Sequence, residues 1–389
     1  MTLPQPAPAH GLFGHLEHSK PDPLLSLIAE FKADPRADKI DLGVGVYQDE
    51  SGITPVMEAV KRAEQDLVDT QDSKTYLGLE GDVGYVAHLA PLITNAPVKG
   101  VQTPGGTGAL RLASELIAHA RPGARVWLGT PTWPNHEPVF KAAGLTIKTY
   151  RHYDPATLSL DFDATREALK SAQEGDIVLL HASCHNPTGA DFSPGQWTEL
   201  AALISLRGLV PLIDFAYQGL GRGFKEDAEG LNKVLAQVDE ALLAYSCDKN
   251  FGLYRDRVGA LFVMAPDSAT VYSNVLAIAR PNWSMPPDHG GAVVRIILES
   301  EELKEIWRLE LDGMRARIHA IRRELAKADP FFAPLADQNG MFGVLPLPPA
   351  KIARLKSEQG IYMAGSGRIN LTGLRGDGLA RFAQAVTQA

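Results

Sequence analysis

The chain has 389 residues, of which 45% are hydrophobic and 22% are charged, and its formal net charge is −8. These values are ordinary for a globular protein of about two domains, and a chain of this length needs no disulfide or metal to stabilise its core. The negative charge and the absence of a basic run argue against a nucleic-acid partner, although a small anion could still bind in a local positive pocket.

The sequence predicts neither export nor a membrane partner. No apolar run is long enough to span a bilayer. The Pro-rich N-terminal stretch MTLPQPAPAHGLFGHLEHSKPDP, which we expect to be extended, has no basic segment leading into an apolar one. Cys184 and Cys247 are the only cysteines, too few for a disulfide framework, so we expect a reducing compartment and a cytoplasmic protein.

Short apolar runs alternate with helical patterns through the middle of the chain. Runs of this kind predict buried strands in a parallel sheet that is covered on both faces. The predicted strands are residues 125–130, 176–181, 209–214, 241–246 and 258–264. Ligands of such sheets bind beyond the carboxyl ends of the strands, and four of these runs end at a polar or special residue.

The stretch TPGGTGALRLASEL, Thr103–Leu116, follows a short predicted strand and opens a predicted helix. Exposed amides at a helix N-terminus bind phosphate, and glycines let the backbone approach the ligand closely. A tight turn without a ligand explains the pattern equally well. A dinucleotide site is disfavoured, because the third glycine of its fingerprint is missing and no acidic residue lies between Glu115 and Glu137. A single phosphate group fits better.

The stretch PTWPNH, residues 131–136, follows the predicted strand at 125–130. Trp133 is either a core residue or a flat surface on which an aromatic ligand stacks. His136, taken alone, is typical of a structural histidine.

The stretch HASCHNPTGA closes the predicted strand at 176–181. His181, Cys184 and His185 suggest a metal site at first sight. A strand and turn do not bring positions i, i+3 and i+4 onto one face, however, and no second cluster completes four ligands, so we predict no metal. Asn186 is a turn former that can also donate a hydrogen bond to a ring oxygen.

Asp214 and Tyr217 lie in DFAYQG, at the end of another apolar run. A carboxylate inside the crevice of a sheet is costly unless it is paired, and a protonated ring nitrogen would be such a partner. Capping of a following helix is the alternative. Tyr217 can offer its phenol to the same ligand.

Lys249 is the one lysine of YSCDKNFGLYRDRVG, residues 245–259. An amine is nucleophilic only without its proton, and burial and neighbouring positive charge lower the pKa of a lysine that forms a Schiff base. Arg257 supplies such charge and can also grip a phosphate through a bidentate fork, to which Ser246 can add a hydroxyl. A polar loop after a strand is the alternative interpretation.

A long amphipathic helix is predicted from residue 307 onward, because apolar residues recur there at a 4-3-4-3-4 spacing. These residues are Trp307, Leu311, Met314, Ile318, Ile321 and Leu325. We expect this helix to face the core and to lead into a second domain, formed by the C-terminal part with help from the N-terminus.

Taken together, these motifs resemble the fold type I pyridoxal-phosphate enzymes, and more narrowly the aspartate and aromatic aminotransferases. The resemblance runs from DLGVGVYQDE near residue 45 to GSGRINLTGL near residue 370. The motifs TPGGTGALR, PTWPNH, CHNPTG, DFAYQG and KNFGLYRDRVG occur in the family's order and approximate spacing. Each motif is weak alone, but the ordered set is highly specific.

The resemblance implies an α/β fold, with a large domain built on a mostly parallel seven-stranded sheet flanked by helices and a smaller α/β domain. The implied boundaries are residues 46–309 for the large domain and residues 1–45 together with 310–389 for the small one. The resemblance also implies a homodimer with shared active sites, because two of the motif residues, Tyr76 and Arg280, make sense only when they come from the partner subunit.

The resemblance assigns pyridoxal 5′-phosphate as the cofactor and gives the motif residues their roles. Lys249 would form the Schiff base and move the proton, Asp214 would hold the pyridine nitrogen protonated, and His136 would orient Asp214. Asn186 and Tyr217 would hydrogen-bond the ring oxygen, and Trp133 would stack on the ring. The phosphate would be held by Gly106, Thr107, Ser246, Arg257 and the partner's Tyr76.

For the substrate, the resemblance implies that Arg368, in SGRIN, binds the α-carboxylate and that Gly45 lies close over the substrate, with Trp133 and Asn186 beside it. Arg280, in RPNWSMPP, would reach across the dimer to a dicarboxylate side chain. The implied reaction is a ping-pong transfer of an amino group between an L-amino acid, aspartate or aromatic, and a 2-oxo acid such as 2-oxoglutarate.

The chain departs from the family pattern at Asp248, where relatives usually carry a serine. A carboxylate there would repel the phosphate, so we expect it to turn away or to pair with a nearby base such as Arg255. Trp283 and Met285 also differ from the usual residues of aspartate enzymes, and an adaptable methionine favours acceptance of aromatic side chains. Thr54 and Thr107, in contrast, look like those of aspartate-preferring members.

Three other readings remain open from the sequence. One keeps the cofactor but changes the reaction to β-decarboxylation or another lyase reaction. A second is a binding protein of the same fold that has lost catalysis, against which the retained Lys249 and Asp214 argue. A third is a hydrolase built on Cys247 or Ser246, which the absence of a nearby histidine and of a GxSxG elbow disfavours.

Overall fold

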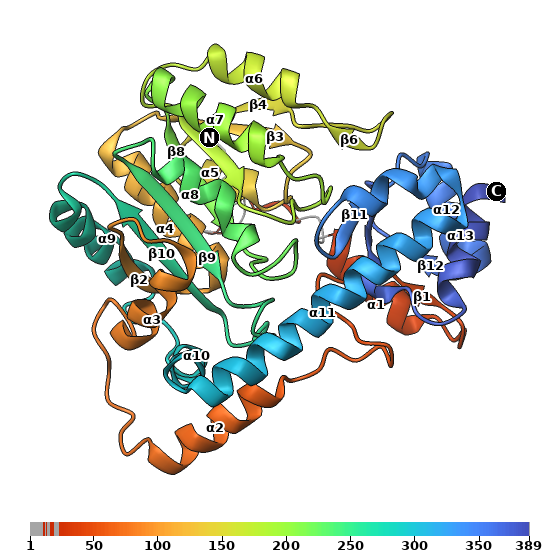
Figure 1. The fold of residues 1–389 in the computed structure, drawn as a ribbon, viewed down its shortest axis with the longest axis horizontal. Coiled ribbons are helices and arrows are strands. Elements are labelled where there is room, and N and C mark those ends of the chain that lie inside the picture. The colour runs from red at the N-terminus through yellow and green to blue at the C-terminus, as the bar shows by residue number, and fades with distance from the viewer. Residues whose placement is uncertain (1–10, 12, 14–15, 19–22, 389) are drawn as a thin grey trace, which may run out of the picture.

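The computed structural model describes residues 11, 13, 16–18 and 23–388. Most of the Pro-rich stretch at residues 1–23, which we expected to be extended, lies outside the described residues, but the Leu16 amide donates to the Phe13 carbonyl at 3.0 Å and a helix begins at Pro23. The described chain forms a large lobe around a seven-stranded sheet and a smaller lobe of helices and short strands, with one long helix running between them (Figure 1). None of the helices in the described part combines the length and the apolar character that crossing a membrane requires.

The central sheet has the strand order β2-β10-β9-β8-β7-β3-β4. Its strands are β2 (Lys99–Pro104), β3 (Arg125–Thr130), β4 (Thr146–Arg151), β7 (Ile177–His181), β8 (Val210–Phe215), β9 (Ala241–Ser246) and β10 (Val258–Met264). Strand β10 is antiparallel to both of its neighbours, and the other neighbouring pairs are parallel. Six strands therefore end at one edge of the sheet, and β10 begins there. The five strands predicted from apolar runs are confirmed, with boundaries that differ by at most one residue.

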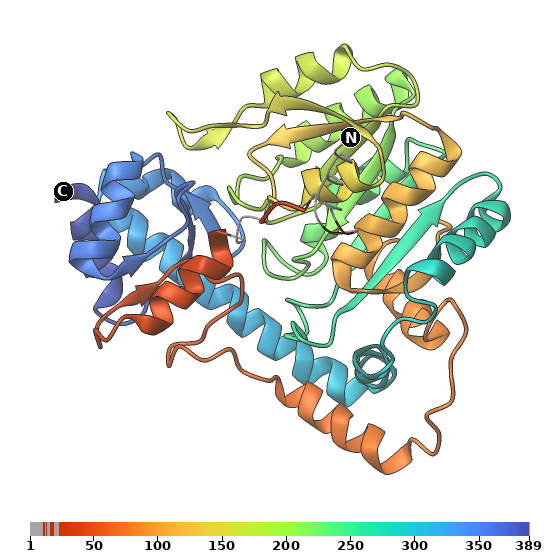
Figure 2. The ribbon, with the colours of Figure 1, turned by 180° about the vertical axis from the view of Figure 1, so that it is seen from behind.

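Helices cover both faces of the sheet, which explains why its strands are apolar throughout. One face carries α4 (Gly105–Ala120), α5 (His136–Ala142) and α9 (Ser268–Asn282), seen from behind in Figure 2. The other face carries α3 (Val83–Ile93), α6 (Phe162–Lys170), α7 (Pro194–Arg207), α8 (Glu229–Leu235) and α10 (His289–Glu299), and α2 (Glu58–Thr70) packs against α10, away from the sheet. Successive side chains of β8 point to opposite faces of the sheet: Leu212 packs against the face that carries α4, and Ile213 packs against the other face.

The long helix is α11 (Glu301–Ala328), and it begins where the Ser300 side chain accepts a hydrogen bond from the Leu303 amide. The predicted apolar stripe is buried along its whole length. Its first four residues, from Trp307 to Ile318, belong to the core of the large lobe, whereas Ile321 and Leu325 belong to the core of the small lobe. One helix thus contributes to two hydrophobic cores.

The small lobe joins the N-terminal segment to the C-terminal part of the chain. Strand β1 (Ile40–Asp41) pairs with β12 (Ile361–Tyr362), and β11 (Phe342–Val344) pairs with β13 (Arg368–Asn370). The remaining elements are α1 (Pro23–Ala33), η2 (Pro330–Asp337), α12 (Pro349–Gln359), η3 (Leu371–Gly373) and α13 (Gly378–Gln388).

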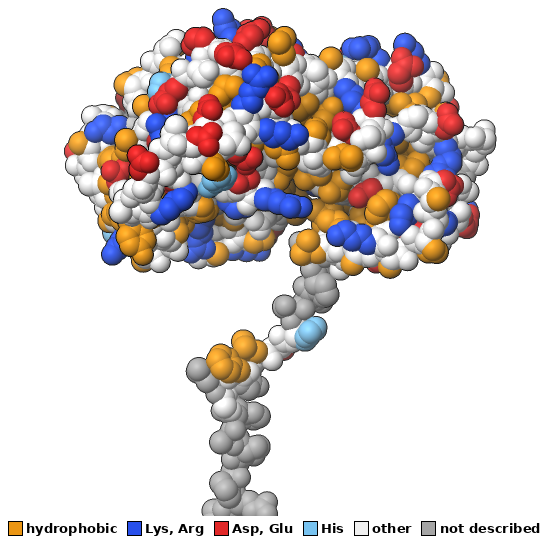
Figure 3. Space-filling view, turned by 90° about the horizontal axis from the view of Figure 1, so that it is seen from below, with side chains coloured by type: hydrophobic (Ala, Val, Ile, Leu, Met, Phe, Trp, Pro, Cys, Tyr) orange, Lys and Arg blue, Asp and Glu red, His pale blue; other side chains and the backbone are white. Residues whose placement is uncertain are grey.

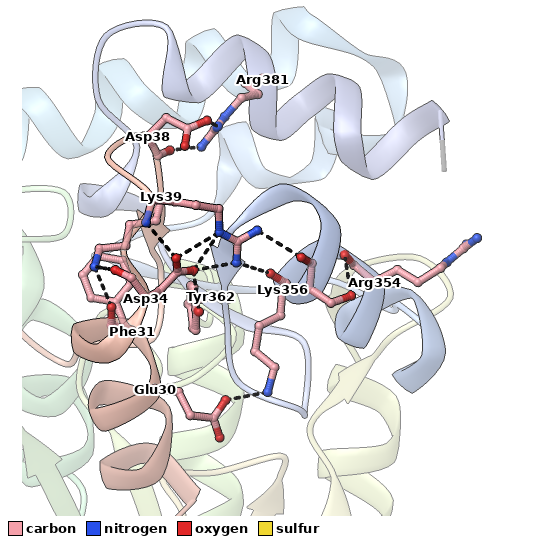
Figure 4. Close-up of polar contacts among 11 residues, drawn as sticks. Glu30, Phe31, Asp34, Asp38, Lys39, Arg354, Lys356, Tyr362 and Arg381 are labelled. Carbon is pink, nitrogen blue, oxygen red and sulfur yellow. Dashed lines mark hydrogen bonds and ion pairs between the residues drawn. The ribbon is translucent and has the colours of Figure 1, made fainter.

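Polar contacts reinforce this junction, as Figure 4 shows. The Tyr362 hydroxyl donates to the Asp34 carboxylate at 2.7 Å, and the same carboxylate forms an ion pair with Arg36 at 2.5 Å. Lys356 pairs with Glu30 of α1 at 2.6 Å. These contacts support grouping the N-terminal segment with residues 310–389, and the domain boundaries at 46 and 309 stay a prediction.

Candidate active site

A cavity of about 260 Å³ lies at the carboxyl edge of the sheet, where the two lobes meet. Its lining includes eleven of the residues predicted from the sequence: Gly45, Gly106, Thr107, Trp133, Asn186, Asp214, Tyr217, Ser246, Lys249, Arg257 and Arg368. A larger groove of about 720 Å³ lies at the opposite edge of the sheet, but its lining contains one carboxylate, Asp239, and no lysine, arginine or histidine. The smaller cavity is therefore the one equipped for chemistry.

One end of the cavity is suited to an anion. Helix α4 begins here, and Gly105, with φ of +72°, turns the chain out of β2. A Cβ added to Gly105 would lie 2.5 Å from Arg257 Nη2, and one added to Gly106 would lie 3.1 Å from Ser246 Cβ. The helix N-terminus, a hydroxyl and a guanidinium thus converge on one spot, which favours phosphate.

Asp214 lies within β8 and reaches into the middle of the cavity. The next helical element does not begin until Glu226, so the carboxylate is not a helix cap. His136 Nε2 lies 3.0 Å from Asp214 Oδ2. Burial raises the pKa of Asp214, but the hydrogen bond and charge of His136 outweigh it, and the pKa is lowered overall. The site therefore holds an ionised carboxylate that can pair with a cationic ring nitrogen.

Further imidazoles continue behind His136. The Thr132 hydroxyl lies 2.7 Å from His136 Nδ1 and 3.2 Å from His181 Nε2. The rings of His181 and His185 stack with centroids 4.1 Å apart, and His152 stacks on the other side of His185 at the same distance. Burial lowers the pKa of His181 to about 3 and that of His152 to about 4. No group of His, Cys, Asp and Glu in the described part of the chain is arranged to hold a metal ion.

Asn186 and Tyr217 meet across the cavity. The Asn186 amide donates to the Tyr217 hydroxyl at 3.2 Å, and Asn186 Oδ1 is buried without a hydrogen-bond partner among the described residues. Burial, with the nearby charge of Asp214, raises the pKa of Tyr217, so the phenol keeps its proton. The two side chains can donate together to one ring oxygen of a ligand.

Lys249 follows β9 and has 19% of its side chain exposed. Burial lowers the pKa of its amine, Asp248 and Asp214 oppose that shift, and Arg257 adds to it. Its Nζ lies 5.5 Å from the centre of the Tyr217 ring and 3.8 Å from Asp248 Oδ2. The amine is therefore easier to deprotonate than a surface lysine.

The prediction that Asp248 turns away or pairs with a base such as Arg255 was wrong in the residue that it named. The carboxylate pairs with Arg257, at 2.6 Å from Oδ2 to Nη1, and not with Arg255, which is exposed. Arg257 has a φ of +57°, and its guanidinium also donates to the Tyr254 carbonyl at 3.0 Å. Asp248 thus engages the same arginine that was predicted to hold the phosphate.

Arg368 enters the cavity from the small lobe. It is 7% exposed, it donates to the Gly43 carbonyl at 2.8 Å, and its guanidinium lies 4.8 Å from the centre of the Phe342 ring. Its Nε is buried without a hydrogen-bond partner among the described residues. Burial lowers its pKa, but an arginine stays charged. A buried guanidinium that keeps one free N–H and lines the same cavity as Gly45 is suited to a carboxylate.

Tyr76 and Arg280 are not brought to the cavity. Tyr76 is 92% exposed, and Arg280 is exposed with its Nη1 on the Ser284 hydroxyl. Nearby, Met285 Sδ accepts a hydrogen bond from the Leu77 amide at 3.0 Å. Both lie outside this chain's cavity, and their action on a partner subunit stays a prediction.

Several lining residues were not predicted from the sequence, among them Leu24, Tyr254 and Phe342. Tyr254 lies inside the motif KNFGLYRDRVG, so the motif itself contained the signal. Its hydroxyl accepts a hydrogen bond from the Tyr47 amide at 2.9 Å. Leu24 and Phe342 come from distant segments without a motif that marks them.

The two thiols do not form a catalytic centre. Both cysteines are free and buried. Cys247 Sγ lies 3.3 Å from the Tyr85 hydroxyl, and burial raises the pKa of its thiol, which makes it a poor nucleophile. Ser246 Oγ accepts a hydrogen bond from the Asp248 amide at 3.2 Å. The hydrolase reading therefore has no support at either residue.

Comparison with known proteins identifies the family. The chain matches the family model for aminotransferase class I and II over residues 37–386. It is 52% identical over 377 residues to a tyrosine aminotransferase of Rhizobium meliloti (strain 1021), which covers 94% of this chain and 96% of the relative. It is 43% identical over 392 residues to an aspartate aminotransferase of Escherichia coli (strain K12), which covers 96% of this chain and 99% of the relative.

Solved structures give the same answer. An aromatic-amino-acid aminotransferase from Burkholderia pseudomallei, covalently bound to pyridoxal phosphate, matches with a TM-score of 0.93 at 36% identity, over 97% of this chain and 98% of that one. The fold is therefore that of the fold type I pyridoxal-phosphate enzymes, as predicted. The chain belongs to the aminotransferase class I and II family, and pyridoxal phosphate is its cofactor.

The residues present fit this cofactor. At the end of the cavity formed by Gly105, Gly106 and Ser246, a side chain added to either glycine would crowd its neighbours. The backbone amides there are therefore open to close approach by a phosphate. The ionised Asp214 suits the ring nitrogen, and the Asn186 amide and the Tyr217 hydroxyl, which are already hydrogen-bonded to each other, are donors that suit the ring oxygen. Lys249 offers an amine to the aldehyde. Each part of the cofactor finds a group of matching chemistry in one cavity.

Proposed function

We propose that this chain transfers the amino group of L-aspartate and of aromatic L-amino acids to a 2-oxo acid such as 2-oxoglutarate, by a ping-pong mechanism. The observation that carries the proposal is the position of Lys249, a partly buried amine in the same cavity as the Asp214 carboxylate and Arg368, whose Nε has no hydrogen-bond partner among the described residues. The relatives include a tyrosine and an aspartate aminotransferase, which supports both substrate classes.

The cofactor would be held at three points. Gly106, Thr107, Ser246 and Arg257 would bind its phosphate, joined by the partner subunit's Tyr76. Asp214, oriented by His136, would bind the ring nitrogen, while Asn186 and Tyr217 would bind the ring oxygen and Trp133 would cover the ring. When bound, pyridoxal phosphate supplies an electron sink that stabilises negative charge at the substrate Cα.

Lys249 is the proposed acid and base. Burial lowers its pKa, which favours the unprotonated amine, and in that form Nζ can accept the α-proton of the amino acid. The ammonium formed in this way can then return the proton to the cofactor carbon that lies next to the transferred amino group. Asp214, whose pKa His136 helps to lower, would supply the negative charge that pairs with the ring nitrogen.

Arg368 would orient the substrate through its α-carboxylate. Its free Nε and the planar fork match a carboxylate bidentately, and stacking on Phe342 fixes the plane of the fork. Gly45, Trp133 and Asn186 would surround the bound amino acid. Arg280 of the partner subunit would contact the second carboxylate of aspartate.

A homodimer is part of this proposal. Arg280 and Tyr76 are exposed and lie outside the cavity of their own chain. The segment that carries Tyr76 also exposes Val68, Leu77 and Val83, and Figure 3 shows hydrophobic side chains in the hollow between the two lobes. Exposed apolar surface of this kind favours a protein interface. The two free thiols support a reducing compartment, which we propose to be the cytoplasm.

The test is a half-reaction. The visible absorbance of the purified, cofactor-loaded protein is recorded before and after adding L-aspartate or L-phenylalanine without a 2-oxo acid. Loss of the absorbance of the bound cofactor with both amino acids is expected, and it should return when 2-oxoglutarate is added. Lys249→Ala is the control, and it should not lose the absorbance of the bound cofactor. A response to aspartate alone would contradict the aromatic part of the proposal, and no response to either would contradict it entirely.

A further inference from the structure

Asp248 places a carboxylate inside the end of the cavity that suits phosphate. The residue is 3% exposed and lines the cavity. Its Oδ2 lies 2.6 Å from Arg257 Nη1 and 3.8 Å from Lys249 Nζ, while Oδ1 is buried without a hydrogen-bond partner among the described residues. A Cβ on Gly105 would lie 3.4 Å from Oδ2, so the carboxylate stands next to the start of α4. It thus occupies surroundings that favour an anion.

The same arginine faces both Asp248 and the phosphate end. Arg257 Nη1 is used by Asp248 and by the Tyr254 carbonyl, whereas Nη2 lies next to Gly105 at the N-terminus of α4. Lys249 and Arg257 are the two cations of this end of the cavity, and Arg368 belongs to the other lobe. One carboxylate therefore already neutralises one of the two cations.

We propose that Asp248 competes with the phosphate group of the cofactor for Arg257, so that it weakens cofactor binding and speeds cofactor release. The inference rests on the proposed function, in which Arg257 and the start of α4 hold the phosphate. Two anions that share one guanidinium repel each other, and the burial of Asp248 limits screening of that repulsion by solvent. Arg257 is 41% exposed, which reduces the effect but does not remove it.

A second role for the same contact must be separated from this one, because Asp248 could instead hold Arg257 in position. Asp248→Asn removes the charge and keeps an oxygen that accepts a hydrogen bond from Nη1. Asp248→Ala removes both. Competition predicts that the asparagine variant binds phosphate more tightly than the natural protein, whereas a positioning role predicts no gain in either variant.

The experiment measures affinity and not turnover. Cofactor is removed from the purified protein, and pyridoxal phosphate is titrated back while absorbance is followed. Inorganic phosphate is then titrated as a competitor. For Asp248→Asn we expect the Kd of both ligands to fall about tenfold, which corresponds to roughly 1.4 kcal/mol. Asp256→Asn, which removes the same charge from a neighbouring residue outside the cavity lining, should leave both values unchanged.

Equal or weaker binding of either ligand by Asp248→Asn would overturn the inference. Tighter binding of pyridoxal phosphate without tighter binding of inorganic phosphate would also overturn it, because the effect would then lie elsewhere in the site. Asp248→Ser is made as a second variant, with its melting temperature checked, and must show the same gain. Absence of saturable pyridoxal phosphate binding by the natural protein would overturn the proposed function as well.

Discussion

His136 Nε2 lies 3.0 Å from Asp214 Oδ2, and the imidazole is completely buried behind a carboxylate that lines the cavity. The Thr132 hydroxyl lies 2.7 Å from the other ring nitrogen, so hydrogen bonds fix the ring at both ends. The arrangement keeps Asp214 ionised in a buried place, where burial alone would raise its pKa.

Replacing His136 should therefore weaken cofactor binding and catalysis, although His136 does not line the cavity itself. In His136→Phe the pKa of Asp214 should rise, because the hydrogen bond that opposes burial is lost. Loss of a hydrogen bond to a charged group costs roughly 1.5–3 kcal/mol, so we expect the affinity for pyridoxal phosphate and kcat each to fall about 10- to 100-fold. His136→Gln, which can still donate, should retain more of both. Equal affinities in the natural protein and the Phe variant would refute this role.

Arg368 is expected to bind every substrate through the α-carboxylate. Arg368→Lys replaces a planar fork with a single ammonium, so KM for L-aspartate and for L-phenylalanine should both rise, by roughly 10- to 100-fold. Cofactor affinity, measured by titration, should not change, because the Arg368 side chain lies on the small-lobe side of the cavity. A rise in KM for aspartate alone would assign the residue to the side-chain carboxylate instead.

Sharing of active sites between subunits can be tested by complementation. Lys249→Ala and Arg280→Ala should each be nearly inactive with L-aspartate. If Arg280 acts on the partner, each two-fold symmetric hybrid dimer contains one site with both natural residues and one site with neither. About half of the dimers formed by random pairing are hybrids, so co-expression should restore about a quarter of the natural activity. If Arg280 acts on its own chain, the hybrid stays inactive. Activity with L-phenylalanine provides the comparison, because that substrate has no second carboxylate.

The buried histidines should make the fold sensitive to acid. The pKa of His152 is lowered to about 4 in the folded protein, against about 6.5 when unfolded, so between these values the unfolded chain binds a proton that the folded chain does not. The stabilisation from the neutral ring is complete above pH about 6.5 and is lost as the pH falls toward 4. Each such histidine costs ~1.4 kcal/mol of stability per pH unit in that window.

His152→Gln removes one of these protons, so its melting temperature should fall less between pH 7.5 and pH 5 than that of the natural protein. His88→Gln is the matched control, because the His88 side chain is 44% exposed and lies on the surface. The idea fails if both variants follow the pH dependence of the natural protein. Thermal melts monitored by circular dichroism across this range provide the measurement.

The sheet was predictable because its strands are buried on both faces, which leaves continuous apolar runs in the sequence. The antiparallel direction of β10 could not be predicted from its own residues. A fully buried apolar run such as VGALFVM is equally typical of a parallel and of an antiparallel strand. Pairing partners are set by contacts between segments far apart in the chain.

The site was predictable where a motif follows a strand, because the carboxyl ends of parallel strands meet at one edge. Asn186, Asp214 and Lys249 come together in this way. The partner of Asp248 was not predictable, since Arg255 and Arg257 are two residues apart and the sequence does not report that Arg257 has a positive φ and pairs with Asp248. Phe342 reaches the cavity from the small lobe, and no local pattern reports such an approach.

Helix α11 has a consequence for how the protein melts. Its stripe from Trp307 to Ile318 completes one core, and Ile321 and Leu325 complete the other. Neither lobe can lose its structure without exposing the half of the helix that it covers, and the helix cannot unfold as a whole without opening both cores. We therefore expect the lobes to unfold cooperatively, in a single calorimetric peak, despite their separate cores. A substitution deep in the small lobe, far from Lys249, would then lower the survival of the active site at high temperature.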